Sequence, residues 1–243
     1  MTIPLPLRSF GAAEGVGVGP VRAHIRAMLD KRVLFLDAEA IVIDKPAGLP
    51  VDPVRDGSLS LENHLASLTF GFKRWPTAVH RLDRDTSGCL LLARTQKAHR
   101  AFSAAFEAGR VAKTYLAVVD GVPDAEEGLI DMPLAKISTR ESGWRIVESP
   151  KGKPSRTRWF REATLGGRTL VRFEPETGRT HQLRVHAASG LGLPIVGDPV
   201  YGRGGSAMLL HAARLQVERD GKPSISAEAP LPPSFGDFAD ARA

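Results

Sequence analysis

Residues 80–88, which read His-Arg-Leu-Asp-Arg-Asp-Thr-Ser-Gly, constrain this chain more than any other stretch. They place Asp83 and Asp85 among arginines in a turn-forming segment, and an apolar run follows at 89–93. Buried carboxylates are costly unless they are paired, so an acid beside permanent cations is a candidate reactive group. The alternative is an exposed loop with surface ion pairs, and this segment alone leaves both interpretations open.

Two further stretches favour the reactive interpretation. Residues 44–51 read Asp-Lys-Pro-Ala-Gly-Leu-Pro-Val, and residues 174–186 contain Thr-Gly-Arg-Thr-His-Gln-Leu-Arg-Val-His, followed by Gly-Asp-Pro at 197–199. The order of these motifs resembles the RluA-type pseudouridine synthases, as do Lys-Thr-Tyr at 113–115 and Leu-His-Ala at 210–212. Several long motifs in one order are a far more specific signal than one short pattern.

Length and composition set the outer limits. The 243 residues suit one large domain, and we expect a flexible leader at 1–19 followed by a single catalytic domain at 20–243. No apolar run approaches the roughly 20 residues of a membrane helix, and the first residues do not form a secretory signal. A single cysteine fits a reducing compartment, so we expect a cytoplasmic protein.

The formal net charge of +6 suits a polyanionic partner such as RNA, because lysine and arginine contacts release counterions from phosphates. Arginine outnumbers lysine, and arginine can bind phosphate bidentately and stack on bases. High-GC coding would also favour arginine, so charge alone supports RNA binding weakly.

Patterning predicts many strands and few helices, hence an α+β domain with a largely antiparallel sheet. The resemblance implies the pseudouridine synthase fold, a mostly antiparallel mixed sheet flanked by helices and loops. The expected helices cover 20–32, the segment with Leu61, Leu65 and Leu68 capped by Ser58 or Ser60, and 96–108, ended by Gly109. The expected strands are 33–37, 40–44, 113–120, 168–173, 180–187 and 208–217, with hairpins and loops at 136–161 and an extended tail after Asp220.

The resemblance also implies which residues act. Asp83 matches the single catalytic aspartate of the family, and Arg184 matches the arginine paired with it; a bidentate guanidinium would fix the carboxylate. Whether that aspartate attacks the sugar, attacks the ring or removes the 2′-proton stays open at this point. Without the resemblance, Arg184 would be a surface arginine on a strand.

Three more residues are expected to bind the substrate. Tyr115 matches the tyrosine that stacks on the target uracil and could take a proton from C5, Leu210 matches an apolar residue of the pocket, and Arg81 matches the arginine that replaces the flipped base in the RNA stem. For Tyr115 and Leu210 the competing interpretation is core packing.

The remaining motifs are expected to be structural. Pro46 and Gly48 set a turn in which Lys45 could contact a phosphate, and Asp198 is a turn acid. His181 and His186 would lie on opposite faces of a strand and Cys89 stands alone, so we expect no metal. The reaction needs no cofactor.

We therefore expect a monomeric RNA pseudouridine synthase that acts on rRNA, on tRNA or on both. The alternatives are a noncatalytic RNA-binding or ribosome-assembly factor on the same fold, and a hydrolase that uses Asp83 and Asp85 as an acid pair. The leader is too short for the separate N-terminal RNA-binding domain that many family members carry.

Overall fold

The computed structural model describes residues 29–54, 57–139 and 143–241. The expected leader and most of the expected helix at 20–32 lie outside these residues, apart from a short 3-10 turn, η1 (Asp30–Arg32). In the described part of the chain, no helix is both long and apolar enough to cross a membrane.

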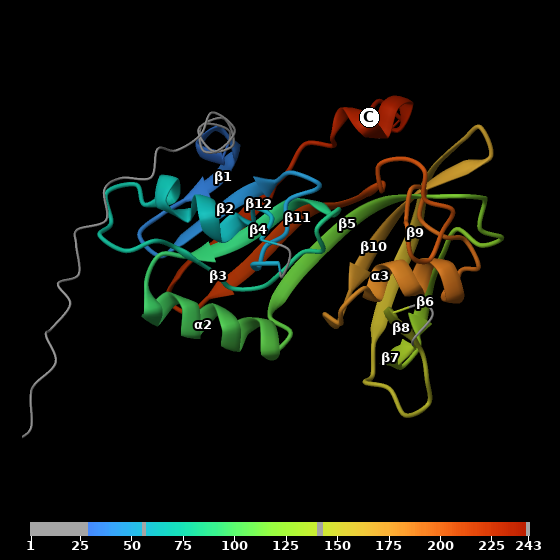
Figure 1. Ribbon diagram of the computed structural model, residues 1–243, viewed down its shortest axis with the longest axis horizontal. Helices are drawn as coiled ribbons and strands as arrows, with labels where there is room; N and C mark the ends of the chain where they lie inside the picture. The colour runs from blue at the N-terminus through green and yellow to red at the C-terminus, as the bar shows by residue number, and fades with distance from the viewer. Residues whose placement is uncertain (1–28, 55–56, 140–142, 242–243) are drawn as a thin grey trace, which may run out of the picture.

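One mixed sheet dominates the fold (Figure 1). Its order is β1-β2-β4-β11-β5-β10-β9-β6, with β3 also paired to β4 and β12 to β11. Only β4 and β11 pair in parallel, so the expected α+β fold with a largely antiparallel sheet is confirmed. The strands are β1 (Val33–Leu36), β2 (Ala40–Lys45), β3 (Thr77–Ala78), β4 (Ser87–Ala93), β5 (Val111–Val119), β6 (Glu127–Asp131), β9 (Arg156–Leu165), β10 (Arg168–Pro175), β11 (Leu210–Arg219) and β12 (Lys222–Glu228). A separate hairpin consists of β7 (Leu134–Thr139) and β8 (Gly143–Glu148).

Two helices cover the half of the sheet that contains β2 and β4. The helix α2 (Gln96–Glu107) packs Phe102 against Leu91 and its neighbours, and the 3-10 helix η2 (Leu61–Leu68) packs on the opposite face against Leu90 and Leu92. All of β4 is therefore buried, which explains its unbroken apolar run.

The helix ends follow local rules. Thr95 Oγ1 accepts a hydrogen bond from the Ala98 amide at 3.1 Å, which caps α2, and Gly109 ends the helix at φ 69°. At the start of η2, the Ser60 amide donates to Asn63 Oδ1 at 2.8 Å. The expected helices at 61–68 and 96–108 are thus confirmed, the first in 3-10 form.

The expected strand at 180–187 is wrong. The chain forms one helical turn, α3 (Gln182–Val185), and continues into a π-helical turn, η3 (His186–Gly190). All four side chains of α3 are buried, and the polar ones find partners inside the protein; Gln182 Nε2, for example, donates to Thr157 Oγ1 at 2.9 Å. The alternation of polar and apolar residues here marks a buried polar network and not the two faces of a strand.

The expected extended tail is confirmed only for its first part. After Asp220 the chain pairs with β11 as β12 and then forms the 3-10 helix η4 (Pro233–Phe238). Phe235 and Phe238 are buried against Leu116 and Leu170 of the central strands. Isolated apolar residues between the prolines anchor this segment, and its proline content alone does not reveal them.

Candidate active site

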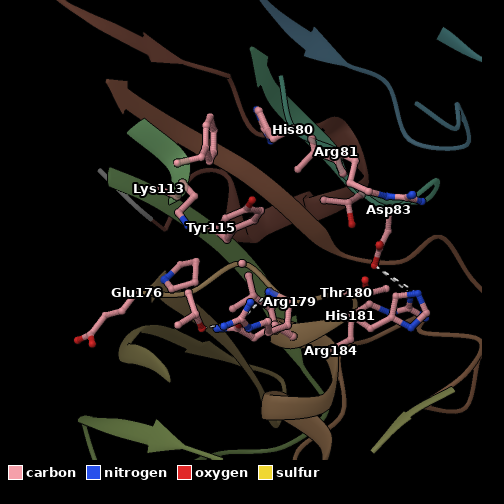
Figure 2. Close-up of a pocket in the computed structure, with 18 of the residues that line it drawn as sticks. His80, Arg81, Asp83, Lys113, Tyr115, Glu176, Arg179, Thr180, His181 and Arg184 are labelled. Carbon is pink, nitrogen blue, oxygen red and sulfur yellow. Dashed lines mark hydrogen bonds and ion pairs between the residues drawn. The ribbon is translucent and has the colours of Figure 1, made fainter. Parts of the chain in front are cut away.

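A cleft of about 580 Å³ opens where the two halves of the sheet meet (Figure 2). Its walls are the segment 79–83, the end of α2, the start of β5 and the segment 175–184. All five residues that the sequence assigned to the site line this cleft: Arg81, Asp83, Tyr115, Arg184 and Leu210. Asp85, the other acid of the motif, is not part of the cleft wall; in the described part of the chain it pairs with Arg84 at 3.2 Å.

A tight turn presents Asp83. The Thr86 amide donates to the Asp83 carbonyl at 3.1 Å, and the chain enters β4 through Gly88 at φ 105°. A Cβ atom at Gly88 would lie 2.3 Å from the Ala212 carbonyl oxygen, so only glycine permits the close approach of β4 and β11. The turn residues thus fix where the carboxylate emerges.

Lys45 holds this turn from inside. Its side chain is fully buried, and Nζ donates to the carbonyls of Pro46 at 2.8 Å, Leu49 at 2.8 Å and Arg84 at 3.0 Å. Burial lowers the pKa of Lys45 to about 7. The expected phosphate contact of Lys45 is therefore wrong, because a side chain sealed in the core cannot reach RNA.

Arg184 connects two carboxylates. Its Nη1 donates to Asp83 Oδ2 at 3.1 Å, while Nε and Nη2 donate to Asp198 Oδ2 at 2.7 Å and Oδ1 at 2.8 Å. The expected pairing of Arg184 with Asp83 is present, but the bidentate contact is made to Asp198. The fork of the guanidinium is anchored on the buried acid, and one remaining N–H reaches the acid in the cleft.

Asp198 also organises its own turn. Its Oδ1 accepts hydrogen bonds from the amides of Val200 at 2.8 Å and Tyr201 at 3.0 Å, as expected for a structural turn acid. Burial alone would raise the pKa of Asp198, but the bonds from Arg184 and from these amides outweigh it and lower the pKa. The two acids in turn raise the pKa of Arg184 against the effect of its burial, so the guanidinium stays charged.

His181 belongs to the site, although the sequence did not assign it there. Its Nε2 lies 3.8 Å from Asp83 Oδ2 (Figure 2). Its Nδ1 lies 2.9 Å from Tyr201 Oη. Tyr201 Oη accepts the Ile146 amide at 2.9 Å, so its own proton is free to point at His181 Nδ1. Burial lowers the pKa of His181, and the neutral ring then carries its proton on Nε2, which faces Asp83.

The backbone conformation of His181 explains why the sequence pattern did not predict His181 as a site residue. His181 has φ 54° and ψ 16°, a left-handed conformation that is uncommon for residues other than glycine. It starts the helical turn and brings the His181 ring beside Asp83 together with Arg184. In a strand, His181 and Arg184 would have pointed to opposite faces, which is why the spacing gave no sign of His181.

Tyr115 and Lys113 form another wall of the cleft from β5 (Figure 2). They lie two residues apart on the strand and therefore on one face. Burial raises the pKa of the Tyr115 phenol and lowers the pKa of the Lys113 ammonium. Among the residues that the structure describes, Lys113 has no acidic partner, so it is a free cation at the edge of the cleft.

Arg81 lies at the exposed rim, where it forms an ion pair of 2.6 Å with Asp52. His80, beside it, is structural: Nε2 accepts the Leu91 amide at 3.0 Å, and the ring stacks on Phe106 with centroids 4.7 Å apart. Burial, with Lys113 nearby, lowers the pKa of His80 to about 3, so it remains a neutral acceptor.

In the described ranges, no group of three or more His, Cys, Asp or Glu side chains is placed to hold a metal.

Comparison with known proteins adds independent findings. Residues 39–189 match the profile of the RNA pseudouridylate synthase family. An uncharacterised RNA pseudouridine synthase of Zymomonas mobilis is 65% identical over 215 residues, which cover 87% of this chain and 98% of that protein. The ribosomal large subunit pseudouridine synthase D of the same organism is 39% identical over 76% of this chain, which spans 59% of that longer relative.

Solved structures agree with the fold. The human RNA pseudouridylate synthase domain containing protein 1 superposes with a TM-score of 0.68 at 30% identity, over 84% of this chain and 85% of that one. The human RNA pseudouridylate synthase domain containing protein 4 superposes with a TM-score of 0.75 at 24% identity, over 90% of this chain and 95% of that one. At that identity the second likeness concerns the fold alone.

Proposed function

Since the chain belongs to the RNA pseudouridylate synthase family, we propose that it isomerises specific uridines in folded RNA with Asp83 as the catalytic residue. One observation carries the assignment of Asp83. Its carboxylate faces the cleft and is held by Arg184, whose other donors are tied to the fully buried Asp198. Asp83 is thereby oriented without being enclosed.

The reaction is an exchange of one bond for another. The bond between N1 of uracil and C1′ of the ribose breaks, the base turns, a bond from C5 to C1′ forms, and C5 loses its proton. An ionised Asp83 can attack the sugar, attack the ring or remove the 2′-proton, and each route needs a carboxylate shielded from water. Arg184 holds the carboxylate in place through one hydrogen bond in all three.

Tyr115 is placed to hold the uracil while its bond to the ribose is broken. Its ring lines the same cleft as Asp83, and stacking on an extruded base is worth roughly 1–3 kcal/mol (Figure 2). Its raised pKa keeps the phenol neutral, so the hydroxyl offers a lone pair near the base. Leu210 supplies an apolar wall, and Arg81 at the rim can leave Asp52 to fill the gap in the RNA stem.

His181 acts as a positioning residue in this proposal. The hydroxyl of Tyr201 fixes its tautomer so that Nε2–H faces the carboxylate of Asp83. At 3.8 Å the contact is longer than a hydrogen bond, so a small movement or one bridging water can make or release it.

For the substrate we propose an rRNA or tRNA stem-loop. The pseudouridine synthase D relative is named for the large ribosomal subunit, and the net charge of +6 suits a polyanion. We further propose a monomeric catalytic domain that works in the cytoplasm. One chain supplies every group that the site uses, and its single cysteine fits a reducing compartment.

Mapping of pseudouridine in total RNA from parent and deletion cells tests the function. One or more modified positions should disappear on deletion and should return when the purified protein is incubated with the RNA of the deletion cells. RNA that binds without conversion would support the noncatalytic alternative, and release of free uracil would support a hydrolase.

A further inference from the structure

The loop that leads into β3 exposes three aromatic rings to solvent. Phe70, Phe72 and Trp75 are all exposed, and Trp75 has 61% of its surface accessible. In the described part of the chain, the only other aromatic residue among the exposed large hydrophobics is Trp144. Three exposed aromatic residues gathered within six positions indicate a binding surface, whereas scattered ones would not.

The protein holds this loop rigidly. Arg94 Nη2 donates to the carbonyls of Thr69 at 3.1 Å and Phe70 at 2.9 Å, and its guanidinium lies 3.8 Å from the ring centroid of Phe72. Phe70 has φ 43°, a left-handed conformation that a bulky residue rarely adopts. These contacts fix the backbone at 69–70 and the ring of Phe72, and Trp75 follows three residues later.

Two cations lie between the rings. Lys73 and Arg74 are both exposed, and within the described residues neither has an acidic partner. With Trp75 they line a hollow of about 540 Å³, whose only acidic wall residue is Glu62. Free cations beside aromatic faces are the composition that binds single-stranded nucleic acid, since rings stack on bases and cations contact phosphates.

The hollow is connected to the active site through one short segment. From Trp75 the chain runs through β3, extended along β4, and reaches Arg81 at the rim of the cleft. Six residues of extended chain span at most about 20 Å, so one folded RNA can occupy both places.

We propose that residues 70–75 form a second RNA-contact surface, where an unpaired base of the substrate stacks on Trp75 and adjacent phosphates bind Lys73 and Arg74. The proposal rests on RNA as the substrate and extends it to a surface outside the cleft. It makes substrate choice depend on a nucleotide a short distance from the target uridine, in addition to the nucleotides within the cleft.

Binding of a labelled oligouridylate of about ten nucleotides tests the stacking contact. Trp75→Ala should raise the Kd by about fivefold or more, and Trp75→Phe should retain most of the affinity. Leu129→Ala on β6 is the matched control, because it also removes an exposed apolar side chain. Equal affinity of Trp75→Ala and the parent would overturn the proposal.

Salt dependence tests the binding of phosphates by the two cations. The double variant Lys73→Gln, Arg74→Gln should reduce the slope of log K against log salt by about 0.7 for each phosphate that the variant no longer binds. Arg214→Gln with Lys97→Gln removes the same charge from β11 and the start of α2, where both side chains are exposed, and should change the slope less. An equal change in both doubles would mean a general charge effect and would overturn the local contact.

Turnover separates this surface from the catalytic assignment. In Trp75→Ala, the single-turnover rate with saturating enzyme should match the parent, because the surface binds RNA and does no chemistry. A reduced rate in the saturated complex, or altered oligomeric state with normal RNA affinity, would contradict the proposal. Full activity of Asp83→Asn would refute the catalytic assignment and leave the Trp75 result unaffected.

Discussion

The turn that carries Asp198 and the turn that carries Asp83 share Arg184 but treat their carboxylates differently. Asp198 is 0% exposed and accepts two bonds from the guanidinium and two from backbone amides. Asp83 is 22% exposed and accepts one bond from Arg184, with His181 at 3.8 Å. One acid is sealed from solvent and accepts four hydrogen bonds, and the other is open to the cleft and accepts one.

This difference in burial and hydrogen bonding distinguishes the structural role of Asp198 from the catalytic role proposed for Asp83. A carboxylate that is fully buried among its donors can anchor an arginine, but a substrate cannot reach it. A carboxylate held by one contact keeps its direction and can still react. The comparison therefore predicts that removal of Asp83 will lower activity with little effect on stability. Removal of Asp198 should mainly lower stability, and it should lower activity less than removal of Asp83, because it loosens Arg184.

The largest expected effect is the loss of activity in Asp83→Asn. Asparagine keeps the shape and removes the charge, so single-turnover rates should fall by more than a thousandfold, or about 4 kcal/mol of barrier. RNA affinity and thermal stability should stay close to those of the parent. Asp85→Asn is the control, since Asp85 lies outside the cleft wall. An equal loss of activity in Asp85→Asn would mean that the assignment of the chemistry to Asp83 is wrong.

Asp198→Asn should act mainly on stability. It leaves Arg184 partly unpaired in a buried place, which should cost about 3 kcal/mol in the free energy of unfolding, measured by urea denaturation. The pKa of Asp198 is lowered in the folded protein, so its contribution is present above the unfolded pKa near 4 and is lost as the pH falls below it. The stability difference between parent and variant should therefore shrink toward low pH. A difference that stays constant down to pH 3 would argue against the pairing.

Arg184→Lys should distinguish the orientation of Asp83 by Arg184 from a contribution of its positive charge alone. Lysine keeps the charge but lacks the planar fork that holds Asp198 bidentately while a further N–H reaches Asp83, so turnover of saturated complex should fall by about a hundredfold, with RNA affinity little changed. In the double variant with Asp83→Asn the rate should be hardly lower than in Asp83→Asn alone, because the pair acts as one unit. Additive losses would show that Arg184 acts independently of Asp83.

The smallest expected effect concerns Tyr201, which touches both turns. Its amide binds Asp198, and its hydroxyl fixes His181. Tyr201→Phe keeps the amide contact with Asp198 but removes the acceptor of the Ile146 amide, so stability should fall by about 1–2 kcal/mol. Loss of the hydroxyl frees the tautomer of His181, and kcat should fall severalfold and vary more with pH below the ordinary histidine pKa of about 6.5, while KM is unchanged. A pH profile identical to that of the parent would remove His181 from the positioning role.

Local patterns predicted most of the elements, because helix caps, the apolar stripe of α2 and the alternation of β5 each reflect short-range rules. The cleft residues were predicted through motifs, and the structure brings Asp83, Tyr115 and Arg184 into one cleft. The strand expected at 180–187 failed where polar residues point inward to meet partners from distant segments. An alternation of polar and apolar residues along the chain cannot distinguish buried polar residues with distant partners from a strand with one polar and one apolar face.

Lys45 and His181 show the same limit. Nothing local indicates that Lys45 is buried, because one of its three carbonyl partners, Arg84, lies 39 residues away. His181 joins the site only through a left-handed backbone and a tyrosine 20 residues further on. Contacts made across the fold decide these positions, and spacing along the chain does not encode them.

The ion pair between Asp83 and Arg184 joins residues that are 101 positions apart, and Ser87 meets His211 across 124. At the roughly 5–20 residues per second of translation, about 5–20 s separate the synthesis of the acid from that of its arginine. Until β11 has left the ribosome and paired with β4, a nascent chain holds Asp83 without its cation. The enzyme therefore gains its activity late in its own synthesis, and a truncated chain that ends before Arg184 should not modify RNA.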